Sequence, residues 1–166
     1  FKKDAATSNL YKVDTNSVFI GGSSAGGVLA LHAGYMTNES ELSPLWQGYV
    51  SSLGGLEGAS GNPGYSSNVR GIFSYAGALA DTNWIHVGDI PFLTMHSEND
   101  NTVIYDVGPP LQQPSLPDLF GSLPLNRRAM NVDIDNKFYS YSGSAHPPHA
   151  QGGEVMDSTI SYTAKF

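Results

Sequence analysis

Short apolar runs recur along the chain and are separated by segments rich in glycine, proline and polar residues. Apolar runs without alternation are typical of strands that are buried on both faces. The pattern predicts strands at 17–21, 69–77, 91–96 and 137–141, the last of them at an edge of the sheet. It predicts helices at 1–10, 25–36 and 154–165, and a shorter turn or helix at 79–85. Strands that alternate with helices or long crossovers indicate an α/β fold, with a mainly parallel sheet and flanking helices.

Apolar positions surround the whole cylinder of the predicted helix 25–36, so we expect a core helix. Two long segments, 37–68 and 104–136, are interrupted by glycine and proline and are predicted to be mostly irregular, with a short helix near the end of the second. Loops of this length are usually functional, so both are candidate lid or pocket segments, with plain surface excursions as the alternative. Large apolar side chains of the first segment either line a pocket or form a small core of their own: Trp46, Tyr49, Leu53, Leu56 and Tyr65.

The length of 166 residues fits a single domain, 1–166, and the net charge is −7. An acidic chain with few lysines and arginines is a poor candidate for binding nucleic acid or an anionic membrane surface. No apolar run is long enough to span a membrane. The absence of cysteine excludes disulfides, zinc–thiolate sites and a cysteine nucleophile. The abundance of glycine, serine, asparagine, threonine and tyrosine favours a secreted or periplasmic protein, although the chain shows no signal peptide.

The pattern Gly22-x-Ser24-x-Gly26 lies between the first predicted strand and the helix that follows it. This is the pattern of a nucleophile elbow, where a serine stands on a sharp turn from strand to helix. We expect the two flanking glycines to relieve collisions in that strained turn. The start of the helix supplies free N–H groups and a positive dipole end, which suit an oxyanion. On the motif alone, a glycine/serine turn between two buried elements is an equally good interpretation.

An acidic residue and a histidine follow later strands in the order that a serine nucleophile requires. Asp100 comes after the strand 91–96, and His146 comes after the strand 137–141. A serine hydroxyl is a weak nucleophile until a base takes its proton, and the base works best when an acid orients it. Because the carboxyl ends of parallel strands meet at one edge of a sheet, these loops should lie near the elbow.

Each of the three positions has rivals in the sequence. Ser23 competes with Ser24 as the nucleophile, Glu98 and Asp81 compete with Asp100 as the acid, and His149 competes with His146 as the base. Asp100 is also typical of an Asx turn.

The other histidines suit supporting positions. His32 lies about 12 Å from Ser24 along the helix axis, too far for a base, and fits a core or interface position. His96 fits a support for the acid loop or the pocket, and His86 carries no signal. No metal site stands out, because His146-x-x-His149 is too short and too rich in proline to resemble a helical ligand pair.

These motifs together resemble the α/β-hydrolase superfamily, in particular its esterase/lipase-type members. The residues that match are Gly22-Ser23-Ser24-Ala25-Gly26-Gly27, then Pro91…His96-x-x-x-Asp100-x-x-Val103, then Gly143-x-x-His146, and the likeness extends from about residue 14 onward. The resemblance implies a serine esterase that acts on a small-molecule ester through an acyl-enzyme and needs no cofactor. It implies Ser24 as nucleophile, Asp100 as acid and His146 as base, with the N–H of Ala25 as an oxyanion donor.

The chain also departs from the family pattern. Complete members have strands before the elbow strand, and a loop there, often rich in His-Gly-Gly, supplies the second oxyanion N–H. No such region precedes residue 17, so we expect the C-terminal portion of a longer protein, truncated at both ends, with an exposed sheet edge at the elbow strand. The alternatives are a peptidase or acyltransferase of the same fold, or an inactive homologue or fragment that serves as a binding or assembly module.

Overall fold

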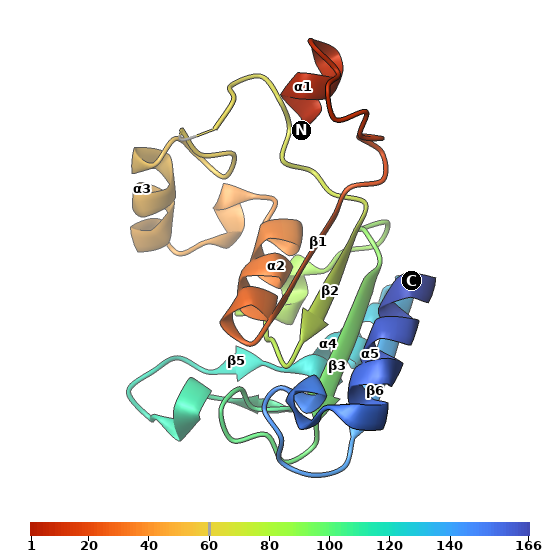
Figure 1. Cartoon of the computed structure of the whole chain (residues 1–166). Coiled ribbons are helices and arrows are strands. Elements are labelled where there is room, and N and C mark those ends of the chain that lie inside the picture. Colours follow the sequence, from red (N-terminus) through yellow and green to blue (C-terminus); the bar gives the residue numbers. More distant parts are fainter. Residues whose placement is uncertain (60) are drawn as a thin grey trace.

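A parallel sheet of four strands forms the centre of the computed structural model, which describes residues 1–59 and 61–166 (Figure 1). Residue 60, within the predicted segment 37–68, lies outside the described residues. The sheet has the order β1-β2-β3-β6. The strands are β1 (Phe19–Ser23), β2 (Gly71–Tyr75), β3 (Phe92–Ser97) and β6 (Asn136–Tyr141). All three pairings are parallel, so the predicted mainly parallel α/β fold is confirmed.

The helices are α1 (Lys2–Ala6), α2 (Ala25–Tyr35), α3 (Pro44–Ser52), α4 (Ser122–Asn131) and α5 (Gly153–Lys165). Short 3-10 turns lie at Glu39–Glu41, Thr82–Trp84, Pro110–Gln112 and Pro148–Gln151. A small antiparallel pair, β4 (Val107–Gly108) and β5 (Leu119–Phe120), lies outside the main sheet.

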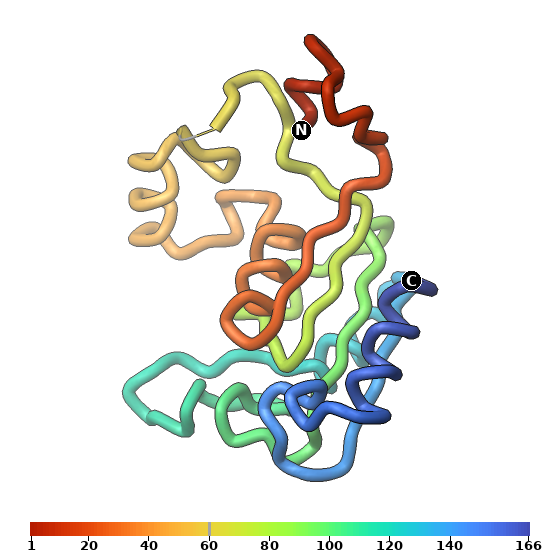
Figure 2. Tube along the Cα trace, viewed as in Figure 1, coloured from red at the N-terminus to blue at the C-terminus, as the bar shows by residue number. Residues whose placement is uncertain are grey.

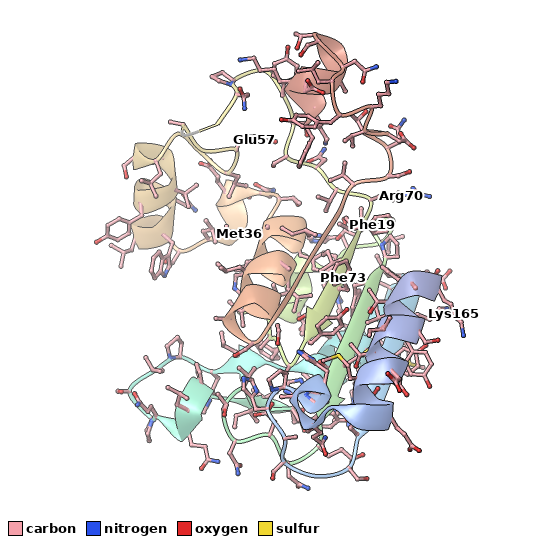
Figure 3. All side chains as sticks on the ribbon, viewed as in Figure 1. Phe19, Met36, Glu57, Arg70, Phe73 and Lys165 are labelled. Carbon is pink, nitrogen blue, oxygen red and sulfur yellow. The ribbon has the colours of Figure 1, made fainter. Side chains whose placement is uncertain are left out.

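Helices cover both faces of the sheet. Side chains of α2 and α4 share one core with Ile72 of β2 and Phe92 of β3. Helix α5 covers the other face, where Tyr162 stacks on Tyr139 of β6 at 3.9 Å between ring centroids. Phe73 of β2 also faces this side and stacks with Tyr75 (Figure 3). The sheet therefore lies in the middle of three layers.

The parallel register brings the carboxyl ends of the strands to one edge of the sheet. Ser23 pairs with Tyr75, Tyr75 with Met95, and Ser97 with Tyr141. The loops after β3 and β6 therefore run side by side, as Figure 2 shows. This edge holds the candidate site.

Helix α2 corrects one prediction about burial. Its buried residues are Gly27, Ala30, Leu31 and Tyr35, whereas Leu29 is 69% exposed. The helix packs on β1 and β2 through one side only, so it is not surrounded by core. In the part of the chain that the structure describes, β2 is the sole partner of β1, and the expected exposed edge at the elbow strand is present.

The prediction of irregular structure is wrong for the middle of segment 37–68, where α3 begins with Pro44 at its first position, after Ser43. Trp46 and Tyr49 contact each other on this helix but are 59% and 56% exposed, so they form no buried core. The second segment, 104–136, likewise contains β4, β5 and the expected short helix, α4.

Within residues 1–59 and 61–166, no helix is long and apolar enough to cross a membrane.

Candidate active site

Ser24 lies on the turn between β1 and α2, in a backbone conformation that residues other than glycine rarely adopt. Its dihedral angles are φ 55° and ψ −123°. Such a conformation costs on the order of 1–3 kcal/mol and persists where the surroundings enforce it. The Ser24 N–H donates to the carbonyl of Tyr75 at 2.8 Å, so β2 helps to hold the turn. The position of Tyr75 at the end of the neighbouring predicted strand is the one sequence signal for this role.

Close packing of glycines sets the path of the chain into α2. A Cβ atom on Gly22 would collide with the backbone of Gly26, and one on Gly27 would lie 2.6 Å from Ser74 Oγ. A Cβ atom on Gly26 would meet no atom within 4 Å. The expectation that both flanking glycines relieve collisions is therefore confirmed for Gly22 and wrong for Gly26, because the bare side of Gly26 faces open space.

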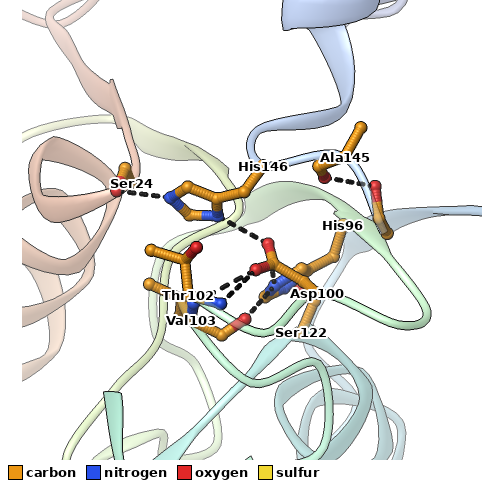
Figure 4. Close-up of polar contacts among 9 residues, drawn as sticks. Ser24, His96, Asp100, Thr102, Val103, Ser122, Ala145 and His146 are labelled. Carbon is orange, nitrogen blue, oxygen red and sulfur yellow. Dashed lines mark hydrogen bonds and ion pairs between the residues drawn. The ribbon is translucent and has the colours of Figure 1, made fainter. Parts of the chain in front are cut away.

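The structure brings Ser24, His146 and Asp100 into one line of hydrogen bonds (Figure 4). His146 Nε2 lies 2.6 Å from Ser24 Oγ, and His146 Nδ1 lies 2.6 Å from Asp100 Oδ2. A carboxylate can only accept, so the imidazole carries its proton on Nδ1. Nε2 is then the acceptor for the Ser24 hydroxyl. The arrangement can draw the proton from the serine while the carboxylate stabilises the resulting charge.

Asp100 is buried, and its second oxygen is held by the backbone. Oδ1 accepts hydrogen bonds from the N–H groups of Thr102, at 2.8 Å, and Val103, at 3.2 Å, which is the Asx-type turn suggested by the sequence. Burial by itself would raise the pKa of Asp100. Hydrogen bonds from His96, His146 and the Thr102 N–H outweigh that effect, so the pKa lies below its usual value. The carboxylate is thus ready to act in its charged form.

The loops that carry the acid and the histidine are fastened to each other. Ser97 Oγ donates to the carbonyl of Ala145 at 2.7 Å, and the N–H of Asn99 donates to the carbonyl of Gly143 at 2.9 Å. The first of these bonds joins the end of β3 directly to the residue before His146. The distance between Asp100 and His146 is thereby set by backbone contacts as well as by their own hydrogen bond.

The rival acids and base are engaged elsewhere. Glu98 accepts from Ser140 Oγ at 2.9 Å, and Asp81 accepts from the N–H of Asn83 at 2.8 Å. His149 packs edge-on against the Tyr75 ring at 5.2 Å between centroids. Burial and the nearby His146 lower the pKa of His149. Among the described residues, only His146, and Asp100 through it, are linked to Ser23 or Ser24 by side-chain hydrogen bonds.

Ala25, the expected oxyanion donor, is the first residue of α2 and directly follows Ser24. N–H groups in the first turn of a helix lack a partner within the helix and lie at its positive end. The position of Ala25 therefore suits an N–H that binds a developing negative charge beside Ser24.

The other histidines that the sequence singled out lie outside this line of hydrogen bonds. His32 Nδ1 lies 2.8 Å from the carbonyl of Val28, and its ring packs edge-on against Trp84. His96 is fully buried beside Asp100, which matches its expected support of the acid loop. Setting aside residue 60, no group of three or more His, Asp or Glu side chains is arranged to hold a metal ion.

Comparison with known proteins gives a likeness at the level of structure only. No family model matches the sequence, and no curated protein matches it. The chain superposes on a truncated carbohydrate esterase from gut microbiota with a TM-score of 0.66 and 19% identity, over 99% of this chain and 63% of that one. It superposes on Thermogutta terrifontis esterase 2 with a TM-score of 0.67 and 15% identity, over 99% and 60% of the two chains.

Esterase PE8 gives a TM-score of 0.54 at 15% identity, over 98% of this chain and 58% of that one. The chain thus spans about three fifths of the length of these esterases. At identities this low, the structural superposition shows the fold alone and does not show the activity. The chain therefore has the fold of the corresponding three fifths of these esterases.

Proposed function

We propose that this chain belongs to a serine esterase that hydrolyses a carboxylic ester of a small molecule through an acyl-enzyme. The observation that carries the proposal is the unbroken line of hydrogen bonds from Ser24 through His146 to Asp100. It is supported by the strained backbone of Ser24, a conformation that a nucleophile elbow requires. The esterase fold of the structural neighbours is consistent with this reading.

In the first half of the reaction, Ser24 Oγ attacks the ester carbonyl carbon while His146 Nε2 takes the hydroxyl proton. Asp100 holds the imidazole by Nδ1 and stabilises its positive charge. The oxyanion that forms is bound by the N–H of Ala25 at the start of α2. When the tetrahedral intermediate collapses, the bond to the alcohol breaks and His146 gives its proton to the leaving oxygen.

In the second half, a water molecule attacks the acyl carbon and His146 Nε2 takes a proton from that water. Collapse of the second tetrahedral intermediate breaks the bond to Ser24 Oγ, and His146 returns the proton to the serine. The carboxylic acid leaves and the enzyme is restored. These steps use only the three side chains, a backbone N–H, the ester and water.

Reaction with a fluorophosphonate probe tests the nucleophile directly. We expect mass spectrometry to find the phosphonyl group on Ser24, and p-nitrophenyl acetate hydrolysis to fall about 10³-fold or more in Ser24→Ala. Ser23→Ala is the matched control, since Ser23 lies next in the chain and forms no part of the line of hydrogen bonds. A protein that hydrolyses the ester equally well after Ser24→Ala would refute the proposal.

A substrate panel separates ester hydrolysis from peptide hydrolysis and acyl transfer, which use the same three groups. The panel includes an ester of a carbohydrate, because one structural neighbour is a carbohydrate esterase. It also includes a peptide amide and an added alcohol acceptor. We expect hydrolysis of esters to dominate.

We further propose a secreted or periplasmic location, which cell fractionation tests.

A further inference from the structure

His96 is a buried histidine whose two ring nitrogens are both engaged. Its side chain, at the end of β3, is 0% exposed. Nδ1 lies 3.0 Å from Ser122 Oγ at the start of α4, and Nε2 lies 2.9 Å from the carbonyl oxygen of Val103 (Figure 4). The same Nε2 is 3.4 Å from Asp100 Oδ2. The steps described above leave this side chain without a task.

The partners of His96 fix where its proton lies. A backbone carbonyl can only accept, so Nε2 carries the hydrogen and donates it toward Val103. The carboxylate of Asp100 faces the same N–H. Nδ1 can then accept the hydrogen of the Ser122 hydroxyl, which fixes the ring from its other side.

His96, Val103 and Asp100 form a closed ring of contacts. Val103 donates its N–H to Asp100 Oδ1 at 3.2 Å and accepts from His96 through its carbonyl. Asp100 Oδ2, which faces His96, is the oxygen that lies 2.6 Å from His146 Nδ1. The carboxylate is therefore held through both of its oxygens, and its orientation sets that of the His146 imidazole.

We propose that His96 is a positioning residue that fixes the Asp100 carboxylate and, through it, the tautomer and orientation of His146. It touches neither Ser24 nor a substrate. An apolar side chain of similar size would fill the same space but would leave the buried Val103 carbonyl without its donor. It would also remove the N–H that faces Asp100 Oδ2 at 3.4 Å. The catalytic consequence rests on the proposed esterase function, whereas the contact itself does not.

A pair of substitutions separates the N–H donor from simple filling of space. His96→Leu removes the donor, and His96→Gln keeps an amide N–H that can reach Val103 and Asp100. We expect kcat for p-nitrophenyl acetate to fall about 10- to 100-fold in His96→Leu, with KM changed less than about twofold. His96→Gln should recover most of kcat. Equal kcat values in the two variants, or an effect confined to KM, would overturn the proposal.

A second readout does not depend on activity. The proton between His146 Nδ1 and Asp100 Oδ2 is expected to give a low-field signal in the proton NMR spectrum of the wild-type protein. We expect that signal to shift and to exchange faster with water in His96→Leu, and to return toward its wild-type position in His96→Gln. An unchanged signal in the leucine variant contradicts the proposal, even if the protein hydrolyses no ester.

A double substitution tests whether His96 acts through Asp100. In an Asp100→Asn background, His96→Leu should lower kcat by less than about twofold, because the carboxylate that it orients is already gone. A full additional loss of 10- to 100-fold would mean that His96 acts by another route. A wild-type protein that neither hydrolyses the ester nor is labelled at Ser24 would instead count against the proposed function. The NMR comparison would still decide the role of His96.

Ser122→Ala tests the same arrangement if the leucine variant does not fold. It removes the hydroxyl at Nδ1 and leaves the contacts of Nε2 in place. We expect a smaller fall in kcat, about 2- to 10-fold, and faster exchange of the proton on His146. A variant with wild-type kcat and wild-type exchange would overturn the proposal.

Discussion

The backbone of Gly26 occupies the space that a Cβ atom on Gly22 would need. This close approach lets β1 turn directly into α2 and leaves Ser24 between them at a φ of 55°. The direction in which the Ser24 hydroxyl points toward His146 therefore depends on the absence of a Cβ atom on Gly22. Gly26 itself has open space where a side chain would start.

Alanine substitutions at these two glycines are predicted to have opposite effects on stability. Gly22→Ala must push the start of α2 away from β1, and we expect it to lower the free energy of unfolding by about 2 kcal/mol or more. Gly26→Ala adds a methyl group in open space on a helix and should raise it by about 0.5–1 kcal/mol. Urea unfolding of the two variants measures both values. Equal destabilisation by the two substitutions would show that the elbow is not packed as described.

Replacing the buried carboxylate is predicted to disable catalysis without moving the loop. Asp100→Asn keeps an oxygen for the Thr102 N–H but no longer holds His146 Nδ1–H with a charge. We expect kcat for a p-nitrophenyl ester to fall about 10³- to 10⁴-fold. Glu98→Gln is the matched control, because Glu98 lies two residues away and bonds to Ser140, and it should stay within about threefold of wild type. The reverse ranking would make Glu98 the acid.

The same carboxylate should contribute to stability in a way that depends on pH. Because the folded-state pKa of Asp100 is lowered, its contribution is complete above the usual aspartate value of about 3.9 and disappears as the pH falls through the lower folded value. The difference in unfolding free energy between wild type and Asp100→Asn should therefore be constant near neutral pH and shrink below about pH 4. Urea unfolding at several pH values gives this difference. A difference that grows on acidification would contradict the lowered pKa.

Much of the candidate site could be predicted because each of its residues follows an apolar run that suits a buried strand. Parallel strands bring their carboxyl ends to one edge of the sheet. A correct prediction of parallel strands therefore also places Ser24, Asp100 and His146 at that edge. Of the rivals, Asp81 has a local partner, the N–H of Asn83 two residues away. These relations are short-range or follow from topology, and both leave a trace in the sequence.

Contacts between distant side chains left no such trace. His96 was expected near the acid loop, but its bond to Ser122 of α4 arises only when helix and sheet are packed. The open space beside Gly26 likewise depends on where its neighbours lie in the fold. Helix α3 is different, since Ser43 followed by Pro44 is a common helix start and outweighed the nearby glycines. This helix is therefore one that the sequence itself signals.

His32 is predicted to make the protein less stable as the solution becomes mildly acidic. Burial lowers the pKa of His32, and the hydrogen bond to the Val28 carbonyl offsets this only in part. Between the ordinary value of about 6.5 and the lower folded value, the unfolded chain binds more protons than the folded one, so stability must fall as the pH falls. His32→Phe keeps a ring against Trp84 and removes the titration. The difference in unfolding free energy between wild type and this variant should be constant above about pH 7 and move against the wild type below about pH 6. The other histidines are the same in both proteins and cancel in the difference. A difference that is flat across this range, measured by urea unfolding, would show that His32 is not buried beside Trp84.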